Sequence, residues 1–164
     1  MGFFSKKRDS KKRKRGFTLI ELLVVIAILL VVGSIVITGF KNFQIRQTLE
    51  LSVKEVRQML EFARSETLAS RGDTQYGVYL DTDKAVLFEG ASYTEGEVGN
   101  DVFELHPQVS LSQISLVPIS DEILFSRGTG EPSSAGFIEV SLVHNPSTTR
   151  TITITTTGII HSNE

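Results

Sequence analysis

One acidic side chain, Glu21, stands alone in a long apolar stretch of this sequence. Residues 17–37 contain no other ionisable side chain. These 21 residues, as a helix rising about 1.5 Å per residue, extend roughly 31 Å, enough to cross the hydrocarbon core of a bilayer. A carboxylate inside such a segment costs about 2.5–3.5 kcal/mol and therefore indicates a function. Glu21 must take up a proton or meet a positive charge.

A dense cluster of positive charge ends directly before this stretch. Residues 1–16 hold eight Lys or Arg and one acid, Asp9, and Gly16 separates the cluster from Phe17. The other 148 residues hold nine Lys or Arg and eighteen Asp or Glu. Without residues 1–16 the net charge is therefore near −9, although the full chain carries −2. The positive-inside rule keeps the basic segment in the cytoplasm and places the C-terminal part outside the inner membrane.

The junction Lys14-Arg15-Gly16-Phe17-Thr18-Leu19-Ile20-Glu21 resembles the class III signal of type IV pilins and pseudopilins. The resemblance implies that a prepilin peptidase cleaves between Gly16 and Phe17, and that Phe17 is then N-methylated. It also implies that Glu21 sets subunit register in a filament by pairing with the free amine of Phe17 in a neighbouring subunit. Such a pair costs far less in a low dielectric than two isolated ions.

Two other interpretations of the junction are open. One is an ordinary membrane anchor that is never cleaved. The other is a conventional secretory signal, which fits less well because its apolar region is typically about 7–15 residues long and ends at a small-residue cleavage site. The apolar run here is longer, and Gly33-Ser34 is a poor substitute for such a site.

Nothing in the sequence interrupts a helix from Phe17 to about Ser70, because the first proline is Pro107. The first part is apolar on all sides, as a helix in lipid or in a bundle should be. Arg71 and Gly72 are expected to end the helix with a cation and a C-cap.

The second half of this helix is amphipathic. Glu50 and Lys54 are spaced as an i, i+4 ion pair on its polar side. Its apolar residues recur every three or four positions and predict one buried stripe: Leu49, Val53, Val56, Leu60 and Ala63.

From Gln75 onward the periodicity becomes two, which predicts short strands. Packing the helix stripe on one face of an antiparallel sheet gives an α+β fold of the pilin kind. The expected strands are residues 76–80, 85–88, 102–105, 113–117, 122–125, 136–143, 149–156 and 158–161. The expected domains are a cleaved leader at 1–16, a transmembrane or filament-core helix at 17–40, an amphipathic helix at 41–72 and a β-rich globular domain at 73–164.

Three further segments resemble the GspH/FimT group of minor pseudopilins and minor pilins. Within the first of them we expect Leu60, Ala63 and Leu68 in the core, and Arg64 and Glu66 in solvent. The segments are Leu60-Glu-Phe-Ala-Arg-Ser-Glu-Thr-Leu-Ala-Ser-Arg-Gly72, Phe125-Ser-Arg-Gly128, and Arg150-Thr-Ile-Thr-Ile followed by Gly158-Ile-Ile.

The chain has no cysteine, so an exported domain must rely on core packing without disulfides. Many major pilins of Gram-negative bacteria close a C-terminal loop with a disulfide. The resemblance therefore points to a pseudopilin, a minor pilin or a pilin of another lineage.

No pattern predicts a metal, a cofactor or an enzyme. The three histidines lie far apart in the sequence without metal-ligand spacing. Asp81, Asp83 and Asp101 would bind calcium only if they converged, and they lack the spacing of the twelve-residue calcium loop. Ser133 and Ser134 have no recognisable base partner.

DNA binding is also disfavoured. Some FimT proteins bind DNA through arginines near the C-terminal glycine, but the segment from Gly158 to Glu164 contains none. From Lys41 onward the chain holds nine basic and seventeen acidic residues, without the Lys/Arg clusters that phosphate contacts need.

We therefore expect a minor pilin or pseudopilin, a structural subunit of a type II secretion pseudopilus or a type IV pilus. It would cross the inner membrane once, with a cytoplasmic N-terminus and a periplasmic or extracellular C-terminal domain. Its partners would be the prepilin peptidase, other pilins or pseudopilins in a filament, and an inner-membrane assembly platform. The alternatives are a membrane-anchored extracellular binding module that never polymerises and a DNA-uptake minor pilin.

Overall fold

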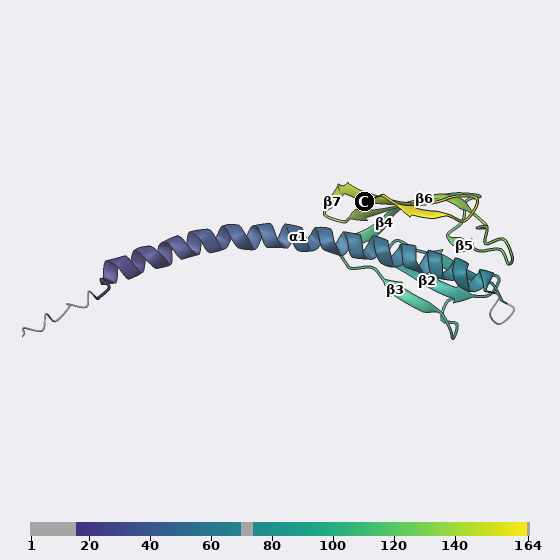
Figure 1. Cartoon of the computed structure of the whole chain (residues 1–164), viewed down its shortest axis with the longest axis horizontal. Helices are drawn as coiled ribbons and strands as arrows, with labels where there is room; N and C mark the ends of the chain where they lie inside the picture. The colour runs from purple at the N-terminus through teal and green to yellow at the C-terminus, as the bar shows by residue number, and fades with distance from the viewer. Residues whose placement is uncertain (1–15, 70–73, 164) are drawn as a thin grey trace, which may run out of the picture. The chain divides into compact units, whose positions relative to one another are not determined.

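One long helix precedes all the strands of the chain (Figure 1). The computed structural model describes residues 16–69 and 74–163, and for residues 35–42 it describes the backbone alone. The helix α1 spans Leu19–Leu68. The chain divides into two compact units, Met1–Lys41 and Asn42–Glu164, so that α1 contributes to both.

The start of α1 is set by a capping threonine. The backbone N–H of Glu21 donates to Thr18 Oγ1 at 3.3 Å, and the N–H of Leu22 donates to the Thr18 carbonyl at 3.2 Å. Thr18 is therefore the N-cap, and the helix begins two residues later than the predicted start at Phe17. The predicted end at Arg71 and Gly72 lies outside the described residues, as does most of the basic leader.

Apolar side chains of the N-terminal unit are exposed. Leu19, Ile20 and Leu30 each expose two thirds or more of their surface, and the large apolar residues between them are also exposed. Among the residues that the structure describes, no helix combines the length and the apolar character needed to cross a membrane.

The apolar stripe predicted for the second half of α1 is confirmed. All five of its members, from Leu49 to Ala63, are buried in the core of the globular unit. Thr67 continues the stripe by one turn and is also buried. Its hydroxyl donates to the Ala63 carbonyl at 2.8 Å and accepts the N–H of Tyr76 at 2.9 Å. This polar link ties the end of the helix to the first strand.

The globular unit contains two antiparallel sheets. This confirms the α+β fold class, but there are two sheets where one was expected. One sheet has the order β3-β2-β1-β5 and the other β4-β6-β7-β8. The strands are β1 Tyr76–Leu80, β2 Lys84–Glu89, β3 Asp101–Glu104, β4 Val109–Val117, β5 Glu122–Leu124, β6 Ala135–Leu142, β7 Asn145–Ile154 and β8 Ile160–Ser162.

The chain passes from one sheet to the other after β4. Pro118 follows the last residue of β4 and has no N–H with which to extend the ladder. β5 then pairs with β1, with Ile123 opposite Val78. Both sheets turn an apolar face inward, and α1 packs against both, so that Val78, Ile123, Ile138 and Ile152 share one core with the helix stripe.

Arg64 was predicted to lie in solvent, and this prediction is wrong. Its Nε donates to the Gly130 carbonyl at 3.1 Å, and its Nη2 donates to the Thr157 carbonyl at 3.3 Å. Gly158 has a φ of 79° and packs so closely that a Cβ there would lie 2.2 Å from the Gly130 oxygen. The guanidinium thus joins the helix to the loop before β6 and to the turn after β7.

Two further expectations for the helix surface are wrong. Leu68 keeps 42% of its surface exposed and is not a core residue. Glu50 forms its ion pair with Arg150 at 2.6 Å rather than with Lys54. Arg150 lies on β7, so the sequence pattern of the helix alone could not predict this ion pair.

A second, smaller apolar cluster covers the outer face of the β3-β2-β1-β5 sheet. Val86 and Phe88 are buried there, although their side chains point away from α1. Gly77 leaves room for the Phe88 ring, because a Cβ at Gly77 would lie 2.6 Å from that ring. Tyr93, from the segment between β2 and β3, stacks on Tyr79 with ring centroids 4.2 Å apart.

Candidate functional site

The predicted cleavage site lies at an open position of the chain. Apart from its chain neighbours, no described residue lies within 4 Å of the place where a Cβ of Gly16 would stand. Phe17 exposes 83% of its surface and precedes α1. A peptide bond between two such residues, outside regular structure, is accessible to a protease.

Glu21 occupies the first turn of α1, where a carboxylate interacts favourably with the helix dipole. Its backbone N–H completes the cap with Thr18. Within the described part of the chain its side chain is exposed and has no ion-pair partner. None of the described residues therefore neutralises this carboxylate.

Thr18 is a residue that our sequence analysis missed. A Thr followed three positions later by Glu at the start of an apolar run is the capping-box signal, and Thr18 and Glu21 have this spacing. The structure brings together Thr18 and Glu21 and places Phe17 immediately before them.

The acidic residues weighed as calcium ligands do not form a site. Asp81 accepts the N–H of Thr82 at 2.7 Å in the turn between β1 and β2. Asp101 begins β3 and faces Leu87 across the ladder. Over residues 16–69 and 74–163, no three His, Asp or Glu side chains are arranged to hold a metal ion.

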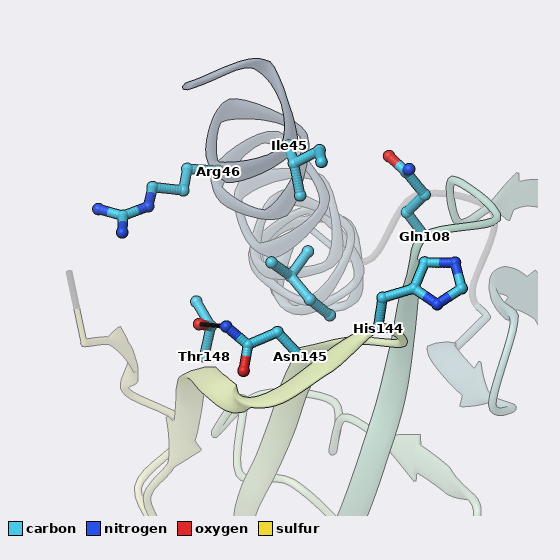
Figure 2. Close-up of a pocket in the computed structure, with 7 residues that line it drawn as sticks. Ile45, Arg46, Gln108, His144, Asn145 and Thr148 are labelled. Carbon is cyan, nitrogen blue, oxygen red and sulfur yellow. Dashed lines mark hydrogen bonds between the residues drawn. The ribbon is translucent and has the colours of Figure 1, made fainter. Parts of the chain in front are cut away.

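A pocket in the globular unit joins segments that are far apart in the sequence (Figure 2). Its cavity of about 360 Å³ lies between α1, the segment before β4 and the β6–β7 turn. The Val143 N–H donates to the Gln108 carbonyl at 2.9 Å and so holds the turn against that segment. The lining residues are Ile45, Arg46, Gln108, Leu142, His144, Asn145 and Thr148.

The pocket lining is mixed, with five polar residues and two apolar ones, Ile45 and Leu142. Figure 2 shows Arg46 on one side of the pocket and Gln108 and His144 on the other. Asn145 Nδ2 donates to Thr148 Oγ1 at 3.1 Å. The Arg46 guanidinium makes no hydrogen bond or ion pair within the described part of the chain. The exposed Arg46 guanidinium is therefore available to an anionic group at one side of the pocket.

Two comparisons with known proteins find similarity to this chain. Residues 11–37 match the family described as the prokaryotic N-terminal methylation motif. This segment includes Gly16, Phe17 and Glu21. A "Fimbrial protein" of Pseudomonas aeruginosa is 30% identical over 95 residues, which are 53% of this chain and 60% of that protein.

A second "Fimbrial protein" of the same organism matches to the same extent. The alignment thus spans less than two thirds of the length of either relative. No solved structure matches this chain.

Proposed function

We propose that this chain is a type IV pilin-like protein with an N-terminal methylation motif, and more specifically a minor pilin or pseudopilin of the GspH/FimT kind. It would be a structural subunit of a type II secretion pseudopilus or a type IV pilus rather than an enzyme. A prepilin peptidase would cleave it between Gly16 and Phe17 and methylate Phe17. The match of residues 11–37 to the methylation motif carries this proposal.

The exposed apolar surface of the N-terminal unit supports assembly. Every side chain from Leu19 to Val32 is exposed, and all of them except Glu21 are apolar. Large exposed apolar surfaces are covered by lipid or by partner proteins. Residues 17–40 would therefore lie in the inner membrane before assembly and against other subunits afterwards, with the globular unit outside the inner membrane and the inner-membrane assembly platform as partner.

Glu21 would fix the register of the assembled subunits. Its carboxylate has no partner among the residues that the structure describes, and cleavage would create an amine at Phe17, four positions away in the sequence. Within one helix these two groups lie near the same end, so that pairing between neighbouring copies fixes an axial offset between them. An ion pair removes most of the cost of holding either charge in a low dielectric.

The three segments that resemble the GspH/FimT group are linked in space. Arg64 belongs to the first segment, Gly130 follows the second and Gly158 belongs to the third. A single arginine and two glycines with positive φ thus build a junction that joins the first and third segments close to the end of the second. This local agreement supports the GspH/FimT assignment.

Substitution of Glu21 tests the proposed function. Glu21→Leu should enter the membrane as well as the natural chain does and should be largely missing from filaments sheared off the cells. Glu21→Asp keeps the charge and is the matched control, which should assemble better than Glu21→Leu. Filaments that incorporate Glu21→Leu normally would contradict the pairing. A natural chain that is never cleaved or assembled would favour the anchored binding module instead.

A further inference from the structure

The pocket that Arg46 lines, which we call the Arg46 pocket, holds a cation without a partner. The Arg46 side chain is exposed, and it makes no hydrogen bond or ion pair within the described part of the chain. The lining of the pocket contains no carboxylate. An anion for Arg46 therefore has to come from outside the described residues.

Cations also line two other pockets of the globular unit, but each of those pockets contains a carboxylate. Arg64 lines one of them together with Glu61 and donates to two backbone carbonyls. Lys54 and Arg57 line the other together with Glu50, and Arg57 Nε lies 3.5 Å from Glu61 Oε1. An anionic ligand would meet a like charge in either of these pockets, whereas the lining of the Arg46 pocket presents none.

Further polar side chains line the same cavity of about 360 Å³. Gln108 and His144 lie across the pocket from Arg46 (Figure 2), and Asn145 Nδ2 donates to Thr148 Oγ1 at 3.1 Å. The side chains of Gln108 and His144 make no hydrogen bond within the described residues. Amide and imidazole N–H groups donate to phosphate oxygens, as a guanidinium does. The lining thus combines one positive charge with free hydrogen-bonding groups, which suits a phosphate.

The sequence keeps this pocket close to the apolar segment. After Glu21 the next ionisable residues are Lys41 and Arg46. Arg46 follows Phe40 by six residues, so their Cα atoms are about 9 Å apart along a helix and at most about 22 Å apart in any conformation. The Cα–Cβ bond of a helical residue tilts toward the helix N-terminus, so the Arg46 side chain starts in the direction of the apolar segment.

The distribution of charge favours a negative surface at the same place. Residues 41–49 contain two cations, Lys41 and Arg46, and no acid. Residues 50–164 contain seventeen acids and seven Lys or Arg, which are the nine from Lys41 onward less these two. Anionic lipid headgroups attract cations that lie directly beside a membrane segment and repel an acidic surface. Residues 41–49 are therefore the part of the globular unit that such a surface would attract.

We propose that the Arg46 pocket binds the headgroup phosphate of an anionic phospholipid, in the membrane that holds residues 17–40. Arg46 would supply the positive charge, and Gln108 and His144 would donate hydrogen bonds from the opposite side. This contact would hold the β6–β7 turn at the membrane surface until the subunit leaves the membrane. The inference rests on the proposed function, in which residues 17–40 lie in the inner membrane before assembly.

The lack of cysteine allows one fluorophore to be placed beside the pocket. Val143→Cys labels the β6–β7 turn outside the pocket lining. Ile159→Cys is the matched control, because both residues expose 48% of their surface. Ile159 lines a pocket with Leu68, which follows Arg46 by 22 residues on α1, an axial distance of roughly 33 Å.

The labelled full chain, purified from its native membrane, is reconstituted in vesicles that contain a lipid with a nitroxide on its headgroup. One set of vesicles is phosphatidylcholine, and the other is phosphatidylcholine and phosphatidylglycerol in equal amounts. The nitroxide quenches only fluorophores close to the headgroups. We expect stronger quenching at Val143 than at Ile159, and more of it with phosphatidylglycerol.

Substitutions in the pocket then test the phosphate site itself. Arg46→Gln should lower the quenching at Val143 severalfold in the phosphatidylglycerol vesicles. Gln108→Leu removes no charge and should lower it by a smaller factor. Lys54→Gln is the matched control for loss of charge, because Lys54 is an exposed cation on the same helix outside this pocket, and it should leave the quenching unchanged.

Three results would overturn the lipid contact. The first is quenching at Val143 that does not exceed quenching at Ile159, and the second is an equal effect of Arg46→Gln and Lys54→Gln. An effect of Arg46→Gln without any effect of Gln108→Leu would reveal a surface charge in place of a phosphate site. Inorganic phosphate, compared with chloride at equal ionic strength, identifies the source of the phosphate. If it abolishes the quenching that depends on Arg46, the pocket takes the free ion and the lipid contact is wrong.

Alkaline extraction of the native membrane and the intact mass separate this inference from the proposed function. A chain that resists extraction and has lost residues 1–16, but shows no quenching that depends on Arg46, would overturn the lipid contact alone. An uncleaved chain with such quenching would overturn the proposed function alone. A chain that alkali removes from the membrane would overturn both.

Discussion

Arg64 has a larger structural role than its position on the helix suggests. It donates to two carbonyls that belong to loops 66 and 93 residues away in the sequence. Removal of the guanidinium leaves the Gly130 and Thr157 oxygens without these donors. The helix, the loop before β6 and the turn after β7 then lose their common link.

We expect Arg64→Met to lower the free energy of unfolding of the globular unit by about 1–3 kcal/mol, the cost of losing one partly buried and one exposed charged hydrogen bond. Lys54→Met is the control, since Lys54 is an exposed cation on the same helix and should change stability by less than about 0.5 kcal/mol. Urea unfolding of the full chain in detergent measures both. Equal changes in the free energy of unfolding for the two variants would show that Arg64 acts only as a surface charge.

The tyrosine stack predicts how stability changes at high pH. Burial, followed by the nearby Asp81 and Asp121, raises the pKa of Tyr79 above its ordinary value of about 10. The unfolded chain then releases this proton at a lower pH than the folded chain does. The contribution of Tyr79 to the free energy of unfolding is therefore complete below about pH 10. It is lost as the pH rises through the pKa of Tyr79 in the folded chain.

Accordingly, the free energy of unfolding should fall above about pH 10, and Tyr79→Phe should make this fall shallower. The two proteins are compared by urea unfolding at several pH values between 8 and 11, at constant ionic strength. Identical slopes for the two proteins would show that Tyr79 ionises equally in both states.

At the scale of elements, the helix stripe and the strands followed from local patterns. Apolar residues recur every three or four positions in the helix and every second position in the strands. Because these repeats lie within short stretches of sequence, the five stripe residues and all eight strands were predicted. The ends were less accurate. β7 begins at Asn145 rather than at the predicted Thr149, with Pro146 inside it. Proline is tolerated there because β8 pairs only with Ile152–Ile154, which leaves the start of β7 at an edge.

Features that depend on distant residues were not predicted. The division into two sheets depends on which strands pair, and the ion pair of Glu50 depends on a residue 100 positions away. The pocket that Arg46 lines is formed by three segments that are far apart in the sequence. A local sequence period does not indicate that such segments come together. Glu21 was identified because it is the one ionisable side chain in an apolar stretch. Thr18 is recognisable only from the capping-box pattern that it forms with Glu21.

The helix stripe is expected to provide most of the stability of α1 in the globular unit. Leu60→Ala should cost about 2–5 kcal/mol, because Leu60 is fully buried and its truncation leaves a cavity. Leu51→Ala on the same helix should cost less than about 0.5–1 kcal/mol, since Leu51 keeps 59% of its surface exposed. Thermal unfolding of the full chain, followed by circular dichroism, compares them. Similar losses for the two variants would show that the stripe is not the packing face.

At the scale of the whole molecule, the two units have complementary properties. The N-terminal unit exposes an apolar helix with one acid, and the globular unit keeps its own core around α1 and two sheets. A chain built in this way is suited to assembly through its first unit and to specific contacts through its second. The methylation motif at residues 11–37 lies at the start of the first unit.

The intact mass of the protein purified from its native membrane tests the central claim most directly. A type IV pilin-like subunit should have lost residues 1–16 and gained one methyl group on Phe17. Fragmentation of the N-terminal peptide would place the methyl group on that residue. A full-length, unmethylated chain, isolated from cells with an active prepilin peptidase, would contradict the account.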